Sequence, residues 1–480
     1  MVFSSLFFIF FFLVVAYGVY FFAKKMKTRN IILLVSSLIF YAWGGPTLVF
    51  LLCLMTFICW IGALLIEQNT LRRSRLALCI TTVAICLSIL FIFKYTGFSL
   101  STVYTIFNID ALVPSIALPI GISFYTFQLI SYVIDVYRGE VEAQKKYWVL
   151  LLYASLFHQC IAGPIVRYAD VNRDIHEREI KLNEVSQGIS RFAVGLAKKA
   201  ILANECGVIA DSVLTSNGAM MNAEQISEVP SVALIIACLC YVIQLYLDFS
   251  AYSDMAIGMG LMVGFHYKEN FNYPYIAHSV TDFWRRWHIS LSSFFRDYVY
   301  IPLGGNRVSV PRHILNMFAV WALTGIWHGA NWNYILWGLY WFVFLVLEKY
   351  LIKPKNNPIL PIRIVRIAVT LVIVFFSTML FKFNDLSALG QAVANIFVSN
   401  GKGFTDAGTS LTFKNNVFFL IVALVSCTPV IPALKKLFDK SEITRRAWTA
   451  VGVVMPVVLL VLSALTLAGD SYNPFLYFQF

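Results

Sequence analysis

The chain has 480 residues, of which 59% are apolar, 16% aromatic and only 13% charged. Soluble domains carry about 25% charged residues, so this composition excludes an ordinary soluble protein, and a mean hydropathy of +0.74 indicates a polytopic membrane protein. The 37 Lys and Arg residues outnumber the 25 Asp and Glu residues, which leaves a net charge of +12. These basic residues do not gather in a polar domain with a nucleic-acid-binding motif, so we expect no nucleic-acid partner.

Long apolar runs recur along the whole chain. A transmembrane helix needs about 20 predominantly apolar residues, and nine runs are candidates for such helices. The runs are Val2–Ala23, Thr47–Ile66, Leu76–Phe93, Ser231–Leu247, Leu315–Trp332, Tyr334–Leu351, Ile364–Phe383, Val417–Leu434 and Trp448–Ala468. The pattern predicts an all-α polytopic membrane protein.

Three further apolar segments are short or broken. Ile31–Trp43 is short for a crossing and ends at a Gly-Gly-Pro turn, which predicts a tight helical hairpin with the next helix. Ile116–Val136 is broken by a proline and a glycine, and Trp148–Ile161 stops just before Gly163-Pro164. Such breaks are tolerated in a membrane only where protein or a water-filled cavity covers the freed backbone.

Basic loops orient the predicted helices. Lys24–Arg29 and Arg72–Arg75 are separated by a pair of helices and belong on one side, the cytoplasm, which places the N-terminus outside. The region 167–199 mixes basic, acidic and amide residues and predicts interfacial helices on the cytoplasmic face.

The segment between Asn270 and His313 contains five arginines and two aspartates but no lysine. A charged side chain at membrane depth costs about 2.5 to 3.5 kcal/mol on insertion scales, so this segment predicts a polar cavity or an interface. Forked guanidinium groups such as Arg285 and Arg286 suit carboxylate or phosphate. Alternatively, Asp282 and Arg286, four residues apart, neutralise one another on an interfacial helix.

Two of the seven histidines lie in polar and aromatic contexts within or beside apolar helices. His328 lies between Gly325 and Gly329, which we expect to leave room for a ligand, and a neutral imidazole can take a hydroxyl proton near pH 7. The same predicted helical face carries Trp321, Thr324, Asn331 and Trp332. His288 is the natural second group, although a buried histidine can also be purely structural. Surface or capping roles suffice for His158, His176, His266, His278 and His313.

The nine cysteines form no C-x-x-C pair and mostly lie inside apolar runs. We expect them to be small buried hydrophobic residues, and we predict no metal site.

Several long strings resemble one known family. Thr281–Leu291, Phe295–Asn306 and Leu323–Ala330, together with Pro119–Gln128 and Asp248–Ala256, resemble motifs of the membrane-bound O-acyltransferase (MBOAT) family, in its bacterial alginate O-acetyltransferase branch. The resemblance implies a helical bundle of about 10–12 membrane helices, some short, broken or re-entrant, around a central tunnel.

The same resemblance implies three parts. Residues 1–115 would form N-terminal transmembrane helices, residues 116–350 the catalytic core with the interfacial helices near 167–199, and residues 351–480 the C-terminal helices and an aromatic tail.

The implied activity is an O-acetyltransferase in the bacterial cytoplasmic membrane. It would take acetyl from cytoplasmic acetyl-coenzyme A, with no bound cofactor, and deliver it to a cell-surface polysaccharide directly or through an extracellular or periplasmic acetyltransferase partner. The catalytic residues would be His328 and His288, with Arg285 and Arg286 binding the donor. Trp327, Asn331 and Asp297 are expected to line the tunnel. Alginate, cellulose and peptidoglycan remain open as acceptors.

The chain ends in a short aromatic tail in which Phe475, Tyr477 and Phe480 form an F-x-Y-x-x-F pattern. One interpretation is an aromatic anchor at the membrane interface. The other comes from resemblance to a terminal motif of related surface-acylation systems, in which the tyrosine carries the acyl group. A phenol can do so only if a base activates it.

A different class of function also fits the apolar spans and intramembrane charges. A glycan-precursor transporter or flippase without catalytic activity would show both features. The paired histidines and the missing internal repeat favour an enzyme.

Overall fold

The computed structural model describes residues 2–161, 163–216, 219–354, 359–398, 405–469 and 475–476. This part of the chain is helical almost throughout, and its strands are the two-residue β1 (Thr215–Ser216) and β2 (Ala219–Met220), paired antiparallel. The predicted all-α class is confirmed.

The chain divides into two compact units, each described by itself. Unit 1 comprises residues 1–192, 252–269 and 293–299, and unit 2 comprises residues 193–251, 270–292 and 300–480. The elements of unit 1 are η1 (Phe8–Phe12), α1 (Leu13–Phe22), α2 (Met26–Ala42), α3 (Pro46–Gln68), α4 (Arg72–Phe107), α5 (Ile122–Arg138), α6 (Tyr147–Ser155), α7 (Tyr168–Glu177), most of α8 (Leu182–Ala197), the end of α11 (Ser231–Met262) and most of η4 (Arg296–Tyr300).

Unit 2 holds the remaining elements. They are η2 (Lys198–Ala203), α9 (Asn204–Leu214), β1, β2, α10 (Ala223–Ser227), the first two thirds of α11, η3 (Pro274–Ile276), α12 (Val280–Trp284), the start of α13 (Ile289–Phe295), α14 (Val310–His328), α15 (Trp332–Leu347), η5 (Glu348–Ile352), α16 (Leu360–Lys382), α17 (Leu386–Phe397), α18 (Ala407–Ser426), α19 (Val430–Phe438) and α20 (Glu442–Gly469).

Seven helices of the described chain are long and apolar enough to cross a membrane, so this is a multi-pass membrane protein. They are α3, α4, α11, α15 with η5, α16, α18 and α20. Six of the nine predicted spans coincide with them. The predicted helix 417–434 is wrong, because the chain leaves helical form between α18 and α19 at Pro429, which has no N–H to continue the ladder.

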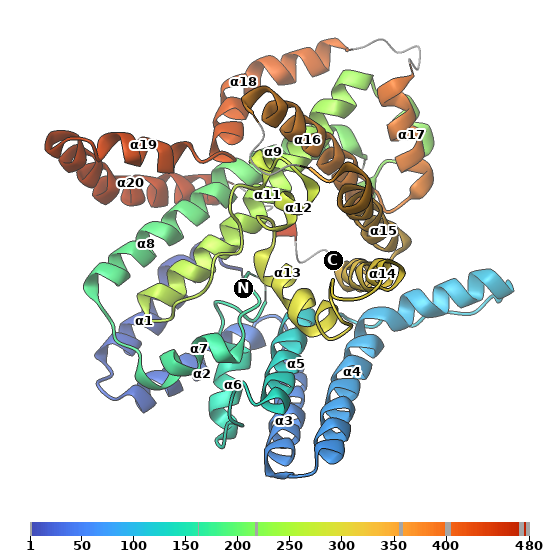
Figure 1. Ribbon diagram of the computed structural model, residues 1–480. Helices are drawn as coiled ribbons and strands as arrows, with labels where there is room; N and C mark the ends of the chain where they lie inside the picture. The colour runs from blue at the N-terminus through green and yellow to red at the C-terminus, as the bar shows by residue number, and fades with distance from the viewer. Residues whose placement is uncertain are drawn as a thin grey trace. The chain divides into compact units, whose positions relative to one another are not determined.

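The predicted hairpin after Ile31–Trp43 and the predicted break before α5 are both present. Helices α2 and α3 pack as a hairpin joined by a short turn. Helix α5 begins only after Gly121, whose φ is 75° and where a Cβ would lie 2.4 Å from the carbonyl oxygen of Cys160. Within unit 1, α3, α4 and α5 lie side by side (Figure 1). The region 167–199 forms α7 and α8, which bury apolar residues such as Val171 and Phe192.

Unit 2 is built around an aromatic core. Helices α14, α15 and α16 follow one another side by side (Figure 1). The core contains Tyr246, Phe249, Phe283, Trp284, Trp287, Trp337, Trp341 and Phe381. Large rigid rings of this kind stabilise a fold through buried area and edge-to-face contacts, and they form the walls of the site described next.

Candidate active site

His328 is the last residue of α14 and lines a cavity of about 50 Å³ inside unit 2. The ring is 8% exposed and meets Trp337 edge to face at 4.7 Å and Phe381 at 5.4 Å between ring centroids. This cavity, called the His328 cavity below, is also lined by Leu245, Asp248, Phe249, Tyr275, Phe283, Trp284, Trp287, Trp341, Val374, Ser377, Thr378 and Leu476. Its walls are mostly aromatic, and its volume suits a few water molecules or an acetyl-sized group.

The helix containing His328 differs from the prediction in two respects. It ends at His328, and Asn331 is the extended residue before α15, so Asn331 and Trp332 do not continue its helical face. The flanking glycines do not leave space for a ligand. A Cβ on Gly325 would meet the backbone of Tyr334 and of Gly338, and one on Gly329 would meet the ring of Tyr334. Both glycines are therefore needed for close packing of α14 on α15.

His288 is buried next to this cavity in the same unit. Its ring contacts Phe249, a wall of the cavity, at 4.6 Å and Trp327 at 6.0 Å, and Trp327 in turn contacts His328 at 4.9 Å. The predicted residues Trp327, His288 and His328 therefore lie together, with Trp327 between the two imidazoles.

The hydrogen bonds of His288 define its neutral tautomer. Its Nδ1 lies 3.2 Å from Oδ1 of Asn270, an oxygen that also accepts from Ser290, so Nδ1 carries the proton. Its Nε2 is buried with no hydrogen-bond partner among the described residues. Burial lowers the pKa of His288 to about 3, so the ring is neutral at physiological pH.

The backbone at His288 is strained. Its φ of 45° lies in the left-handed region, which costs a non-glycine residue about 1–3 kcal/mol and persists only where the surroundings hold it.

The short helix α12, which precedes His288, is fixed at its start by the Ser279 hydroxyl, which accepts the N–H of Asp282 at 3.1 Å. Glu348 of η5 accepts the N–H groups of Val280 at 2.6 Å and Thr281 at 3.0 Å.

The two donor-binding candidates have different surroundings. Arg286 donates from Nε to Asp282 at 2.9 Å, so the alternative of local neutralisation holds for this pair. Arg285 lines a polar pocket of about 760 Å³ together with Lys349 and Lys353, called the cationic pocket below. Its other lining residues are His278, Ser279, Thr281, Asp282, Glu348 and Pro354. Since Asp282 is paired with Arg286 and Glu348 caps α12, the pocket retains a positive charge suited to an anion.

A third pocket of about 240 Å³ shares Thr281 and Lys349 with the cationic pocket. It reaches Trp321, whose ring contacts Trp284 in the wall of the His328 cavity at 4.6 Å. The third pocket therefore adjoins the cationic pocket, and the Trp284–Trp321 contact links its lining to that of the His328 cavity.

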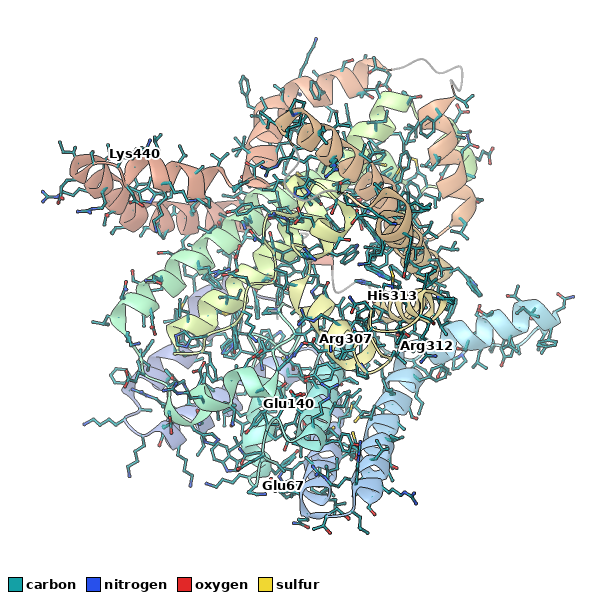
Figure 2. All side chains as sticks on the ribbon, viewed as in Figure 1. Glu67, Glu140, Arg307, Arg312, His313 and Lys440 are labelled. Atoms are coloured by element: carbon teal, nitrogen blue, oxygen red, sulfur yellow. The ribbon has the colours of Figure 1, made fainter. Side chains whose placement is uncertain are left out.

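His313, near the start of α14 (Figure 2), lines the third pocket. It is only 6% exposed, and its two ring nitrogens bond the hydroxyls of Tyr300 and Tyr350. His158 is fully buried and bonds the hydroxyl of Tyr267 at 2.7 Å. The expected surface or capping role is therefore wrong for both histidines, because each has a tyrosine partner supplied by a distant part of the chain.

The remaining predicted residues lie elsewhere or outside the described chain. Asp297 belongs to unit 1, where it accepts from Arg167 at 2.7 Å and from Arg296 at 2.6 Å. Its place in a tunnel, like that of the half-buried Asn331, stays a prediction. Tyr477 and Phe480 lie outside the described residues, whereas Phe475 is buried. No group of three or more His, Cys, Asp or Glu residues in the described chain could hold a metal ion.

Sequence patterns missed Asp248, Lys349 and Lys353. Asp248 follows directly on the apolar run Ser231–Leu247, and an ionisable residue inside a membrane helix is itself a signal of function. The two lysines lie outside the arginine-rich segment, and only the fold brings them to Arg285.

The fold and the site define an all-α membrane protein with a buried histidine in an aromatic cavity and a separate cationic pocket. Residues 146–384 match the family model described as MBOAT, membrane-bound O-acyltransferase family. The chain is 36% identical to the probable alginate O-acetylase AlgI of Pseudomonas putida over 100% of both chains. It is 32% identical to the peptidoglycan O-acetyltransferase of Helicobacter pylori over 71% of this chain and 68% of that one. It is 28% identical to the teichoic acid D-alanyltransferase of Bacillus subtilis over 49% of this chain and 60% of that one.

This chain belongs to the membrane-bound O-acyltransferase family. The predicted family is confirmed, and the chain is an O-acyltransferase rather than a transporter without catalytic activity.

Proposed function

We propose that this protein is an O-acetyltransferase of the bacterial cytoplasmic membrane that uses cytoplasmic acetyl-coenzyme A to supply acetyl groups for a cell-surface polysaccharide. The observation that carries the proposal is His328 in an aromatic cavity, within the segment that matches the family model. Two relatives are named for acetylation of alginate and of peptidoglycan, which favours acetyl as the group and an envelope polysaccharide such as alginate as the final acceptor.

The donor is proposed to bind with its phosphates in the cationic pocket. Arg285, Lys349 and Lys353 supply charge-assisted hydrogen bonds, which are the stronger kind for phosphate. The third pocket adjoins the cationic one and ends at Trp321, so a long thioester arm could extend through it toward the Trp284–Trp321 contact and His328.

The chemistry assigned to His328 is general-base catalysis. Its imidazole takes the proton from an acceptor hydroxyl as the hydroxyl oxygen attacks the thioester carbonyl. The new C–O bond forms, the C–S bond breaks, and the departing thiolate receives the proton from the imidazolium. Trp284 and Trp341 line the cavity, and their indole N–H groups have no acceptor among the described residues. They are candidates to donate to the thioester oxygen. His288 is assigned to orienting the site.

The immediate acceptor is proposed to be the phenol of Tyr477 or a hydroxyl of an extracellular or periplasmic acetyltransferase partner, which passes the acetyl group to the polysaccharide. Support for Tyr477 comes from its neighbour Leu476, which lines the His328 cavity.

The test is acetyl transfer from radiolabelled acetyl-coenzyme A in vesicles that contain the purified protein. His328→Ala should reduce thioester consumption by about 10²- to 10⁴-fold, the usual contribution of a general base. His158→Ala is the control, since it removes a buried histidine that does not line the His328 cavity, and it should retain activity per folded molecule. Wild-type rates in His328→Ala at equal folded protein would refute the proposal.

For the relay, mass spectrometry should find an acetyl group on Tyr477 during turnover. Tyr477→Phe should abolish this species and slow the transfer. A fully active Tyr477→Phe variant would leave the partner hydroxyl as the acceptor and exclude the relay.

A further inference from the structure

Lys199 and Asp248 form an ion pair deep inside unit 2. Lys199 Nζ, on η2, lies 2.6 Å from Oδ1 of Asp248, on α11, and the two side chains are only 2% and 3% exposed. Desolvating two charges costs free energy that their attraction recovers only with good geometry and further hydrogen bonds. Charged residues within membrane helices are rare for the same reason and mark functional positions.

The further contacts of this pair come from the C-terminal tail. The backbone N–H of Leu476 donates to Oδ2 of Asp248 at 2.9 Å. The ring of Phe475 lies under Lys199, with Nζ 4.6 Å from the ring centroid, a cation–π contact. Both tail residues are buried. Each member of the ion pair therefore binds a different residue of the tail.

The anchored tail also forms part of the His328 cavity. Asp248 and Leu476 line that cavity together with His328 itself. The residue that follows Leu476 in the sequence is Tyr477.

We propose that the Lys199–Asp248 pair is a docking site for the C-terminal tail, and that both residues are positioning residues that keep the tail as one wall of the His328 cavity. Neither residue takes part in the chemistry. The effect on transfer rests on the proposed function, whereas docking itself does not.

A second lysine–aspartate pair in the same unit provides a matched control. Lys382 Nζ lies 3.0 Å from Oδ1 of Asp211 and 4.7 Å from the ring centroid of Tyr241. This pair has the same residue types and a cation–π contact, but its side chains are more exposed, at 15% and 39%, and neither residue lines the His328 cavity.

The test for docking measures the rate at which a small maleimide labels the cysteine of a Leu476→Cys variant in vesicles. The labelling of the parent chain, which has its own cysteines, is subtracted as background. The Lys199→Met, Asp248→Leu double variant removes both charges together, so no buried charge is left unpaired. Labelling of the cysteine should become at least tenfold faster in this background. It should change less than twofold with Lys382→Met, Asp211→Leu.

If the cysteine is labelled at the same rate in both double variants, whether slowly or quickly, the docking proposal is overturned. The same two double variants, with Leu476 intact, are then assayed for acetyl transfer. The first should lose at least tenfold and the second less than twofold, and an active first variant would refute the positioning role. If the tail is released as expected but the wild-type protein transfers no acetyl from acetyl-coenzyme A, the proposed function fails and the docking site stands.

Discussion

The crossing of α14 and α15 yields a sharp prediction for Gly325→Ala. A Cβ at Gly325 would lie 2.5 Å from the carbonyl oxygen of Tyr334 and 3.2 Å from Cα of Gly338, whereas ordinary contact begins at 3.4 Å. Both neighbours are backbone atoms that cannot rotate away. The two helices would therefore have to separate by roughly 1 Å.

The separation should impair activity more than stability. Overpacking costs about 1–3 kcal/mol, and the higher helix propensity of alanine recovers about 1 kcal/mol. His328 follows Gly325 by less than one turn, and Trp337 directly precedes Gly338, so their ring contact at 4.7 Å shifts with the helices. A displacement of about 1 Å at a reacting group can cost up to 10²-fold in rate. We expect a fall of about ten- to a hundredfold in transfer with only a small fall in melting temperature.

The assay compares acetyl transfer and thermal unfolding of Gly325→Ala with those of Gly452→Ala. Gly452 lies within α20 and has no atom within 4 Å of an added Cβ, so its variant should match the wild type or be slightly more stable. If Gly325→Ala and Gly452→Ala behave alike in both measurements, the close approach of α14 to α15 does not position His328.

Three other changes test separate parts of the structure. Glu348→Gln replaces a carboxylate that accepts the first two N–H groups of α12. It should lower the unfolding free energy by about 1–2 kcal/mol. An unchanged melting temperature would argue against this cap. Arg285→Ala should raise the KM for acetyl-coenzyme A about tenfold with little change in kcat, while Arg286→Ala should mainly reduce stability; the reverse pattern would exchange their roles. Burial raises the pKa of Asp297, but hydrogen bonds from two arginines outweigh it and hold the pKa below its usual value. The stability lost in Asp297→Asn should therefore be greatest above about pH 4 and shrink as the pH falls through the lowered folded-state pKa; a loss that is constant across unfolding curves at pH 7, 4 and 3 would contradict the ion pairs.

The sequence by itself determined the class of the protein. Hydropathy alone predicts most of the spanning helices, because apolar runs about 20 residues long are a local property of the chain. The long strings around Trp284 and His328 carried the family resemblance. His288 and His328 stood out because polar side chains are costly in so apolar a chain. Cysteine spacing and charge counts added only exclusions.

The tertiary structure decided how these residues are surrounded. Gly325 and Gly329 were expected to leave room for a ligand. Instead, Tyr334 and Gly338 of the next helix pack directly against them. The fold also distinguishes the two neighbouring arginines, because Arg286 pairs with Asp282 whereas Arg285 lines the cationic pocket. The contact of Leu476 with Asp248 joins positions 228 residues apart. Such contacts depend on how helices cross and where the chain returns. Local composition and spacing do not encode these features, because the partner of each group is supplied by a different helix.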